Sequence, residues 1–184
     1  MLTREEAYKI LKKNVTNKNL QKHCIACEVV MKALAEHFGE DAETWGLAGL
    51  LHDIDYEETK DQPDKHSLVG ARMLEELGLP EELIYAVKVH NCAHGLPRNS
   101  LMDKALYATD PVTGLIVAGA LIRPEKSLAA VDVPFLMNRF GEKSFARGAN
   151  REQIAACSEL GLELEEFLEI SLKAMQGAAK ELGL

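Results

Sequence analysis

The sequence predicts an all-α fold, a single-domain helical bundle. Apolar residues recur at spacings of three, four and seven along most of the chain, whereas the alternating apolar pattern of β-strands is almost absent. The length of 184 residues, of which 47% are hydrophobic, suits one core of ordinary globular composition. No repeat, low-complexity tract or linker divides the chain.

Roughly nine helices follow from this periodicity and from the residues that end helices. The clearest apolar stripes comprise Leu20, Cys27, Met31, Leu34 and Phe38; Leu47, Leu50, Leu51 and Ile54; and Leu68, Ala71, Met73, Leu74 and Leu77. Helix ends are expected at Gly39, at residues 77–80 (LGLP), at residues 94–100 (HGLPRNS), at Pro124 and Pro134, and at Gly148. The predicted helices span about 3–13, 17–38, 42–55, 66–77, 80–91, 100–122, 132–140, 150–160 and 163–182.

Charge and composition exclude several classes of function. The net charge is −8, and residues 36–82 carry 14 acidic and 3 basic residues, so we expect no binding to a nucleic-acid duplex. The charged N-terminus does not resemble a signal peptide, and no uninterrupted apolar run suggests a membrane span, so we expect a cytoplasmic protein. The four cysteines are therefore expected to be reduced thiols, and the CxxC at residues 24–27 to be core packing.

Asp110 is the most informative single residue. It is the only charge between Ala105 and Ile122, and it lies on a stripe with Leu106, Thr113 and Val117. An unpaired buried carboxylate costs several kcal/mol, so Asp110 needs a positive partner or a proton. Pro111 is expected to bend or unwind this helix, so Asp110 is either the N-cap of a second helix or a metal ligand.

Other helices also place polar residues beside apolar stripes. His23 lies between Leu20 and Cys27, where by itself it would more often be a satisfied core histidine than a ligand. His52 and Asp53 flank the apolar stripe of the third helix, one on each side. Together, His23, His52, Asp53 and Asp110 suggest ligands that converge on one divalent metal.

Three more histidines lie between the His-Asp pair and Asp110. His66 precedes one predicted helix, His90 ends another, and His94 follows in a turn. They indicate a second ion or donors that face a phosphate, and His66 and His90 are the stronger candidates. As an alternative, His66 is a helix-end residue and His94 faces solvent.

In this order, on separate helices, these residues resemble the HD-domain superfamily of metal-dependent phosphohydrolases, and residues 50–55 (LLHDID) resemble its HDIG signature. The resemblance covers residues 18–122. It implies a bundle of the HD-domain type, one domain over residues 1–184, with the metal site in 18–122 and helices of 123–184 packed on it. Asp55 replaces the signature glycine. Tyr56 stands where some nucleotidase members carry a glutamate, so that catalytic role is not carried over.

The resemblance implies one or two divalent ions, held by His23, His52, Asp53, Asp110, His66 and His90. Nitrogen and oxygen donors suit Fe, Mn, Ni, Co, Zn or Mg. Such ions activate water and polarise a phosphoryl oxygen. Asp53 would orient the attacking water, and His66 or His90, if free of metal, would protonate the leaving oxygen.

Basic residues are the candidates for phosphate contacts. Those from position 139 onward recur every four residues, which places them on one helical face, and such a row is more often simply solvated. The candidates are Lys104, Arg123, Lys126, Arg139, Lys143 and Arg147, with Arg151 continuing the row.

The resulting hypothesis is a metal-dependent phosphohydrolase that acts on a small phosphorylated molecule. The alternatives are a di-iron oxygenase on the same scaffold and a metal-retaining binding protein without turnover. The expected partner is the substrate alone, with no duplex and no membrane, and a homodimer is left open.

Overall fold

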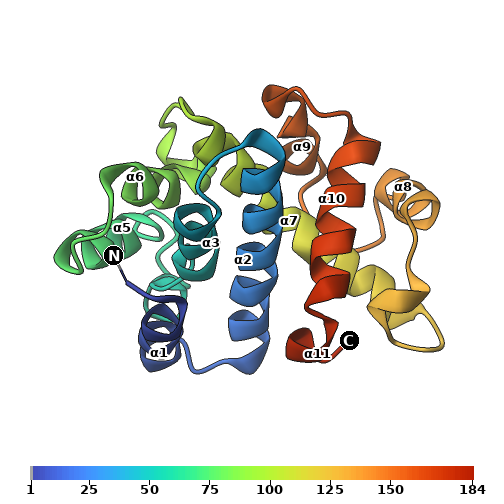
Figure 1. Cartoon of the computed structure of the whole chain (residues 1–184), viewed down its shortest axis with the longest axis horizontal. Helices are drawn as coiled ribbons and strands as arrows, with labels where there is room; N and C mark the ends of the chain where they lie inside the picture. The colour runs from blue at the N-terminus through green and yellow to red at the C-terminus, as the bar shows by residue number, and fades with distance from the viewer. Residues whose placement is uncertain (1) are drawn as a thin grey trace.

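The structure is a computed structural model that describes residues 2–184; Met1, which the expected domain includes, lies outside the described residues. Its elements are α-helices and short 3-10 helices, with no strand in the described part of the chain, which confirms the predicted all-α class (Figure 1). The helices are α1 (Arg4–Asn14), α2 (Lys18–Phe38), α3 (Ala42–Leu51), α4 (Tyr56–Thr59), α5 (Leu68–Glu76), α6 (Glu81–His90), η1 (Cys92–His94), α7 (Leu101–Ile122), η2 (Leu128–Ala130), α8 (Val133–Gly141), α9 (Arg151–Ala155), η3 (Ala156–Leu160), α10 (Leu164–Gly177) and α11 (Ala179–Leu182).

The predicted helix over 42–55 is too long. α3 ends at Leu51, and the chain continues as a turn. In this turn, the Ile54 N–H donates to the Leu51 carbonyl and the Tyr56 N–H donates to the Asp53 carbonyl. His52 and Asp53 therefore project from the end of a helix rather than from its side. The predicted helices over 150–160 and 163–182 are each divided in two as well.

α2 and α3 form the most extensive helix pair in the described residues. α2 begins at the N-cap Asn17, whose side chain accepts from two backbone N–H groups, and ends at Gly39 with a left-handed φ of 73°. A Cβ at Gly49 of α3 would stand only 2.6 Å from the Cys27 carbonyl oxygen of α2. Glycine therefore permits the close crossing that brings the ends of these helices together.

α7 is the long central helix and contacts α2, α6 and α9 (Figure 1). It is continuous from Leu101 to Ile122, with Pro111 inside it, and its N-cap is Ser100 in a capping box with Asp103. α7 is thus not unwound at Pro111, and Asp110 is not an N-cap; the bend that is the other expected effect of Pro111 stays a prediction. By length and composition α7 could cross a membrane, but 61% of its apolar window is buried inside the protein, which accounts for that composition.

The C-terminal helices share the core of the first part of the chain. α10 packs against α2 and α7, and one apolar cluster includes Leu34 of α2, Leu115 of α7 and Phe167 of α10. In Figure 1, α10 runs beside α2, with α7 passing behind both.

The expected basic helical face beyond position 139 is wrong, because α8 ends at Gly141 and the chain turns until α9. Arg151 instead organises this turn with its guanidinium group. It donates to the backbone carbonyls of Arg139, Phe140, Glu142, Phe145, Ala146 and Ala149.

The close crossing of α2 and α3 leads to a stability prediction. Gly49→Ala places a methyl group against the α2 backbone, so we expect it to lower the free energy of unfolding by about 1–3 kcal/mol. Gly114→Ala is the matched control, because a Cβ there meets nothing within 4 Å. In mid-helix it should stabilise by about 0.5–1 kcal/mol. Urea unfolding of both variants tests this, and equal stabilities would contradict it.

Candidate metal centre

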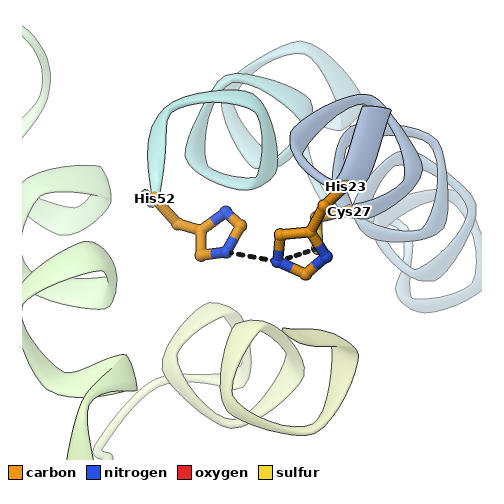
Figure 2. A group of neighbouring side chains, drawn as sticks. All are labelled: His23, Cys27 and His52. Carbon is orange, nitrogen blue, oxygen red and sulfur yellow. Dashed lines mark hydrogen bonds between the residues drawn. The ribbon is translucent and has the colours of Figure 1, made fainter. Parts of the chain in front are cut away.

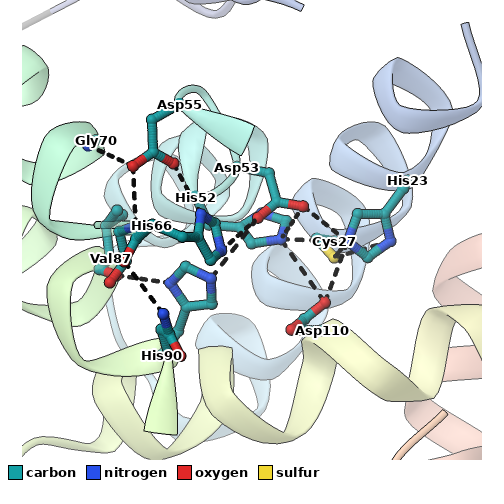
Figure 3. Close-up of polar contacts among 12 residues, drawn as sticks. His23, Cys27, His52, Asp53, Asp55, His66, Gly70, Val87, His90 and Asp110 are labelled. Carbon is teal, nitrogen blue, oxygen red and sulfur yellow. Dashed lines mark hydrogen bonds and ion pairs between the residues drawn. The ribbon is translucent and has the colours of Figure 1, made fainter. Parts of the chain in front are cut away.

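The structure brings together all six residues predicted as metal ligands (Figure 3). His23 comes from α2, Asp110 from α7 and His90 from the end of α6. The turn after α3 contributes two and the turn before α5 contributes one, and these are His52, Asp53 and His66.

One half of the cluster lies between α2, α3 and α7. His23 Nε2 is 3.2 Å from His52 Nε2 and 3.2 Å from Asp110 Oδ1 (Figures 2 and 3). Asp53 Oδ2 completes this half at 3.6 Å from His23 Nε2 and 3.5 Å from His52 Nε2.

The other half uses the second oxygen of the same carboxylate. Asp53 Oδ1 is 3.3 Å from His66 Nε2 and 3.7 Å from His90 Nε2. Asp53 thus lies between two groups of imidazoles and offers one oxygen to each.

The remaining ring nitrogens of the four histidines are held by acceptors. Nδ1 of His52 donates to the Gly49 carbonyl at 2.8 Å, and Nδ1 of His90 donates to the Val87 carbonyl at 2.6 Å. His66 Nδ1 is 2.9 Å from Asp55 Oδ1.

The fourth histidine follows the same pattern. His23 Nδ1 is 3.0 Å from the Thr113 hydroxyl, which donates its own proton to the Asp110 carbonyl and so can accept from His23. Since each Nδ1 donates, each neutral imidazole presents a bare Nε2 lone pair to the cluster.

Without a cation, these lone pairs and carboxylates need protons between them. Burial lowers the pKa of His52, but the charges of Asp53 and Asp110 outweigh it and raise the pKa to about 9. Burial also lowers the pKa of His66, but contacts with Asp53 and Asp55 outweigh it and raise the pKa to about 10.

The pKa values of the two carboxylates shift in the opposite direction. Burial raises the pKa of Asp53, but the His52 charge and the contacts with His66 and His90 hold it well below its usual range. Burial also raises the pKa of Asp110, but hydrogen bonds with His23 and His52 outweigh it and lower the pKa.

These donors fit a divalent metal. Facing Nε2 lone pairs only 3.2 Å apart repel unless a cation or a proton lies near them, and their Nδ1 atoms are already fixed as donors. Histidine and carboxylate donors suit the divalent metals expected from the sequence. The cluster could therefore hold such an ion.

Cys27, which the sequence predicts to be a core-packing residue, is a neighbour of the cluster. Its Sγ lies 3.8 Å from His23 Nε2 (Figure 2). Burial raises the pKa of this thiol well above its usual value, which disfavours the thiolate that a metal needs. The expected core-packing role agrees with this position, and all four cysteines are free.

The comparison with known protein families matches the part of the chain that carries these six residues. The family model of the HD domain matches residues 20–120. The chain belongs to the HD-domain family. Membership places it in a superfamily of metal-dependent phosphohydrolases.

Several relatives of this HD domain are ribonucleases Y. That of Desulfotalea psychrophila is 27% identical over 140 residues, covering 73% of this chain and 26% of the relative. An uncharacterised protein of Methanocaldococcus jannaschii is 33% identical over 116 residues, covering 59% of this chain and 66% of the relative. The chain thus spans about a quarter of the ribonuclease Y relative. No solved structure matches significantly.

His94 of this HD domain lies outside the cluster. Its Nε2 donates to the His66 carbonyl at 2.7 Å, and the Asn91 side chain donates to the same oxygen. His94 therefore braces the backbone of His66, in agreement with its lower rank among the candidates.

The residues expected to contact phosphate are not gathered at the cluster by any described contact. Arg123 donates to the Ala130 carbonyl and lies over Phe135, and Arg139 pairs with Glu142. Lys104 and Arg123 stand about 9 and 20 Å from Asp110 along α7. Lys143 and Arg147 line a separate surface hollow, Lys126 is exposed beyond α7, and the role of all six stays a prediction.

Metal binding to this HD domain should release protons. The raised pKa values of His52 and His66 mean that both imidazoles are protonated at pH 7.5 without metal, whereas ligands must be neutral. Metal affinity should therefore increase with pH up to about pH 9–10 and decrease towards acid. Zn²⁺ titration calorimetry in buffers of different ionisation enthalpy measures the released protons. No release at pH 7.5 would contradict this assignment.

Proposed function

We propose that the protein is a metal-dependent phosphohydrolase that acts on a small phosphorylated molecule. The observation that carries the proposal is the position of Asp53, whose two oxygens face separate pairs of histidines. This arrangement favours two ions, the first with His23, His52 and Asp110 and the second with His66 and His90.

Each side chain then has a role. A bound divalent ion would supply a water of lowered pKa and a Lewis acid for a phosphoryl oxygen. Asp53 keeps the two positions in register and orients the attacking water. His90 is buried and fixed by Val87, which favours a purely ligating role. His66 is more exposed, so it is the better candidate for protonating a leaving oxygen if it is free of metal.

The open side of the cluster lies at His23 and Asp110, whose side chains are 23% and 32% exposed. A cavity of about 440 Å³ beside His23 is lined by Lys22 and Thr113. A second cavity, of about 700 Å³, also has His23 in its lining, together with Lys60, Asn17 and Glu57. These volumes suit a nucleotide-sized ligand, and the lysine in each lining favours an anion.

The same donors would also suit the di-iron oxygenase alternative. The lysines beside His23 favour the phosphohydrolase, since a phosphate benefits from them. The similarity to ribonuclease Y supports including short oligoribonucleotides with mononucleotides in the substrate panel. Oxygen uptake without phosphate release in that panel would contradict the proposal.

Removal of the shared carboxylate is the first functional test. Asp53→Ala should lose metal and reduce phosphate release to the background rate. It should keep its helical content, because Asp53 is a polar side chain in the turn after α3. Metal analysis, circular dichroism and a phosphoester assay measure these outcomes. Asp61→Ala, which alters an exposed carboxylate nearby, is the control and should leave both metal and rate unchanged.

The proposed substrate site in the cavity lined by Lys60 gives a second prediction. Lys60→Ala should increase KM about tenfold with little change in kcat, since a charge-assisted contact contributes about 1.5 kcal/mol or more. Lys143→Ala provides the comparison, because Lys143 lies at a different hollow. Steady-state kinetics decide between them, and an effect of Lys143 alone would instead support the phosphate contacts expected from the sequence.

A further inference from the structure

Asp55, the residue that replaces the signature glycine, is buried beside the cluster, and both of its carboxylate oxygens have hydrogen-bond partners. It is 1% exposed, and its Oδ1 lies 2.9 Å from His66 Nδ1. Its Oδ2 accepts from the backbone N–H group of Ser67 at 2.8 Å and from that of Gly70, also at 2.8 Å. Figure 3 shows Asp55 between His66 and Gly70. An ionised carboxylate only accepts hydrogen bonds, so the proton in the pair with His66 lies on Nδ1.

The backbone around His66 is held as firmly as its ring. Ser67 has a φ of 70°, which a non-glycine residue adopts at a cost of about 1–3 kcal/mol and keeps only where its surroundings impose it. The N–H of Ser67 binds Asp55, and its hydroxyl donates to the Lys88 carbonyl. These bonds fix the direction in which His66 leaves the chain.

Gly70 leaves room for the buried carboxylate. A Cβ at this position would stand 3.2 Å from Asp55 Cγ and 3.3 Å from Oδ1. Such contacts are tighter than usual and would push Asp55 away from His66. The turn before α5 and the first turn of this helix are thus shaped around Asp55.

We propose that Asp55 is a positioning residue that acts through His66. It holds the His66 proton on Nδ1 and so directs the unprotonated Nε2 towards Asp53 Oδ1, which completes the second half of the metal site. This inference rests on the proposed two-ion function. A carboxylate behind a histidine ligand both orients the ring and increases its basicity.

Asp55→Asn separates this role from a structural one. The amide has one acceptor and one donor, and the two backbone N–H groups of Ser67 and Gly70 require the oxygen. The NH₂ group then faces His66 Nδ1, which must accept. The proton moves to Nε2, where it blocks ligation, while the bonds to the start of α5 remain.

Asp103→Asn is the matched control. Asp103 is also buried to 1% exposure, and it also accepts two backbone N–H groups, those of Asn99 and Ser100, at the start of a helix. It has no contact with the cluster among its described hydrogen bonds. A generic loss of a buried carboxylate would affect both variants alike.

The experiment titrates each metal-free protein with Co²⁺ and follows stoichiometry and the visible absorption of the bound ion. The wild type and Asp103→Asn should bind two ions. Asp55→Asn should bind the second about 10- to 100-fold more weakly, as should His66→Gln. Combining the two substitutions should add little to His66→Gln alone, because Asp55 acts through that residue.

The outcomes distinguish the inference from the function on which it rests. Two ions bound by Asp55→Asn with unchanged affinity and spectrum would overturn the inference and leave the proposed metal site intact. A wild type that binds fewer than two ions would overturn the two-ion site and the inference together. Nitrogen-15 NMR of the Zn²⁺-loaded wild type needs no variant: a protonated Nδ1 on His66 is expected, and an unprotonated one would overturn the role of Asp55.

Discussion

The shared carboxylate of Asp53 is the constraint around which the candidate metal site is arranged. It is buried and lies within 3.7 Å of four imidazole nitrogens that come from four separate segments. A buried anion is stable only with close positive or proton-donating partners, so these segments must converge. The early end of α3, the close crossing at Gly49 and the unbroken path of α7 all serve that convergence.

The fold positions the imidazoles by fixing the nitrogen that faces away from the cluster. Backbone carbonyls hold His52 and His90, a hydroxyl holds His23, and a carboxylate holds His66. Without metal, the raised pKa values of His52 and His66 keep protons on their inward nitrogens, and a bound cation would have to displace them. Binding of the proposed ions would be coupled to folding, because an ion that binds only the folded state stabilises it by mass action.

The sequence predicts the helical class and the inward position of His23 and Asp110 because both depend on local pattern, whereas His66 and His90 are expected as ligands through the resemblance to the HD domain. His23 and Asp110 interrupt apolar stripes of α2 and α7, and the period of 3.6 residues is enough to show that they face the core. Asp55, in contrast, appears in the sequence only as a departure from a signature. Its role depends on a turn with positive φ at Ser67 and on the space beside Gly70, and neither has a local sequence signal. The sequence does not predict the turn around Arg151, because regular spacing of basic residues resembles a helical face.

The most direct test of this account is the anomalous difference map of a crystal of the protein loaded with Mn²⁺ or Zn²⁺. The account predicts two peaks, one among His23, His52, Asp53 and Asp110 and the other among Asp53, His66 and His90. Peaks only at surface carboxylates, or none within bonding distance of Asp53, would contradict it.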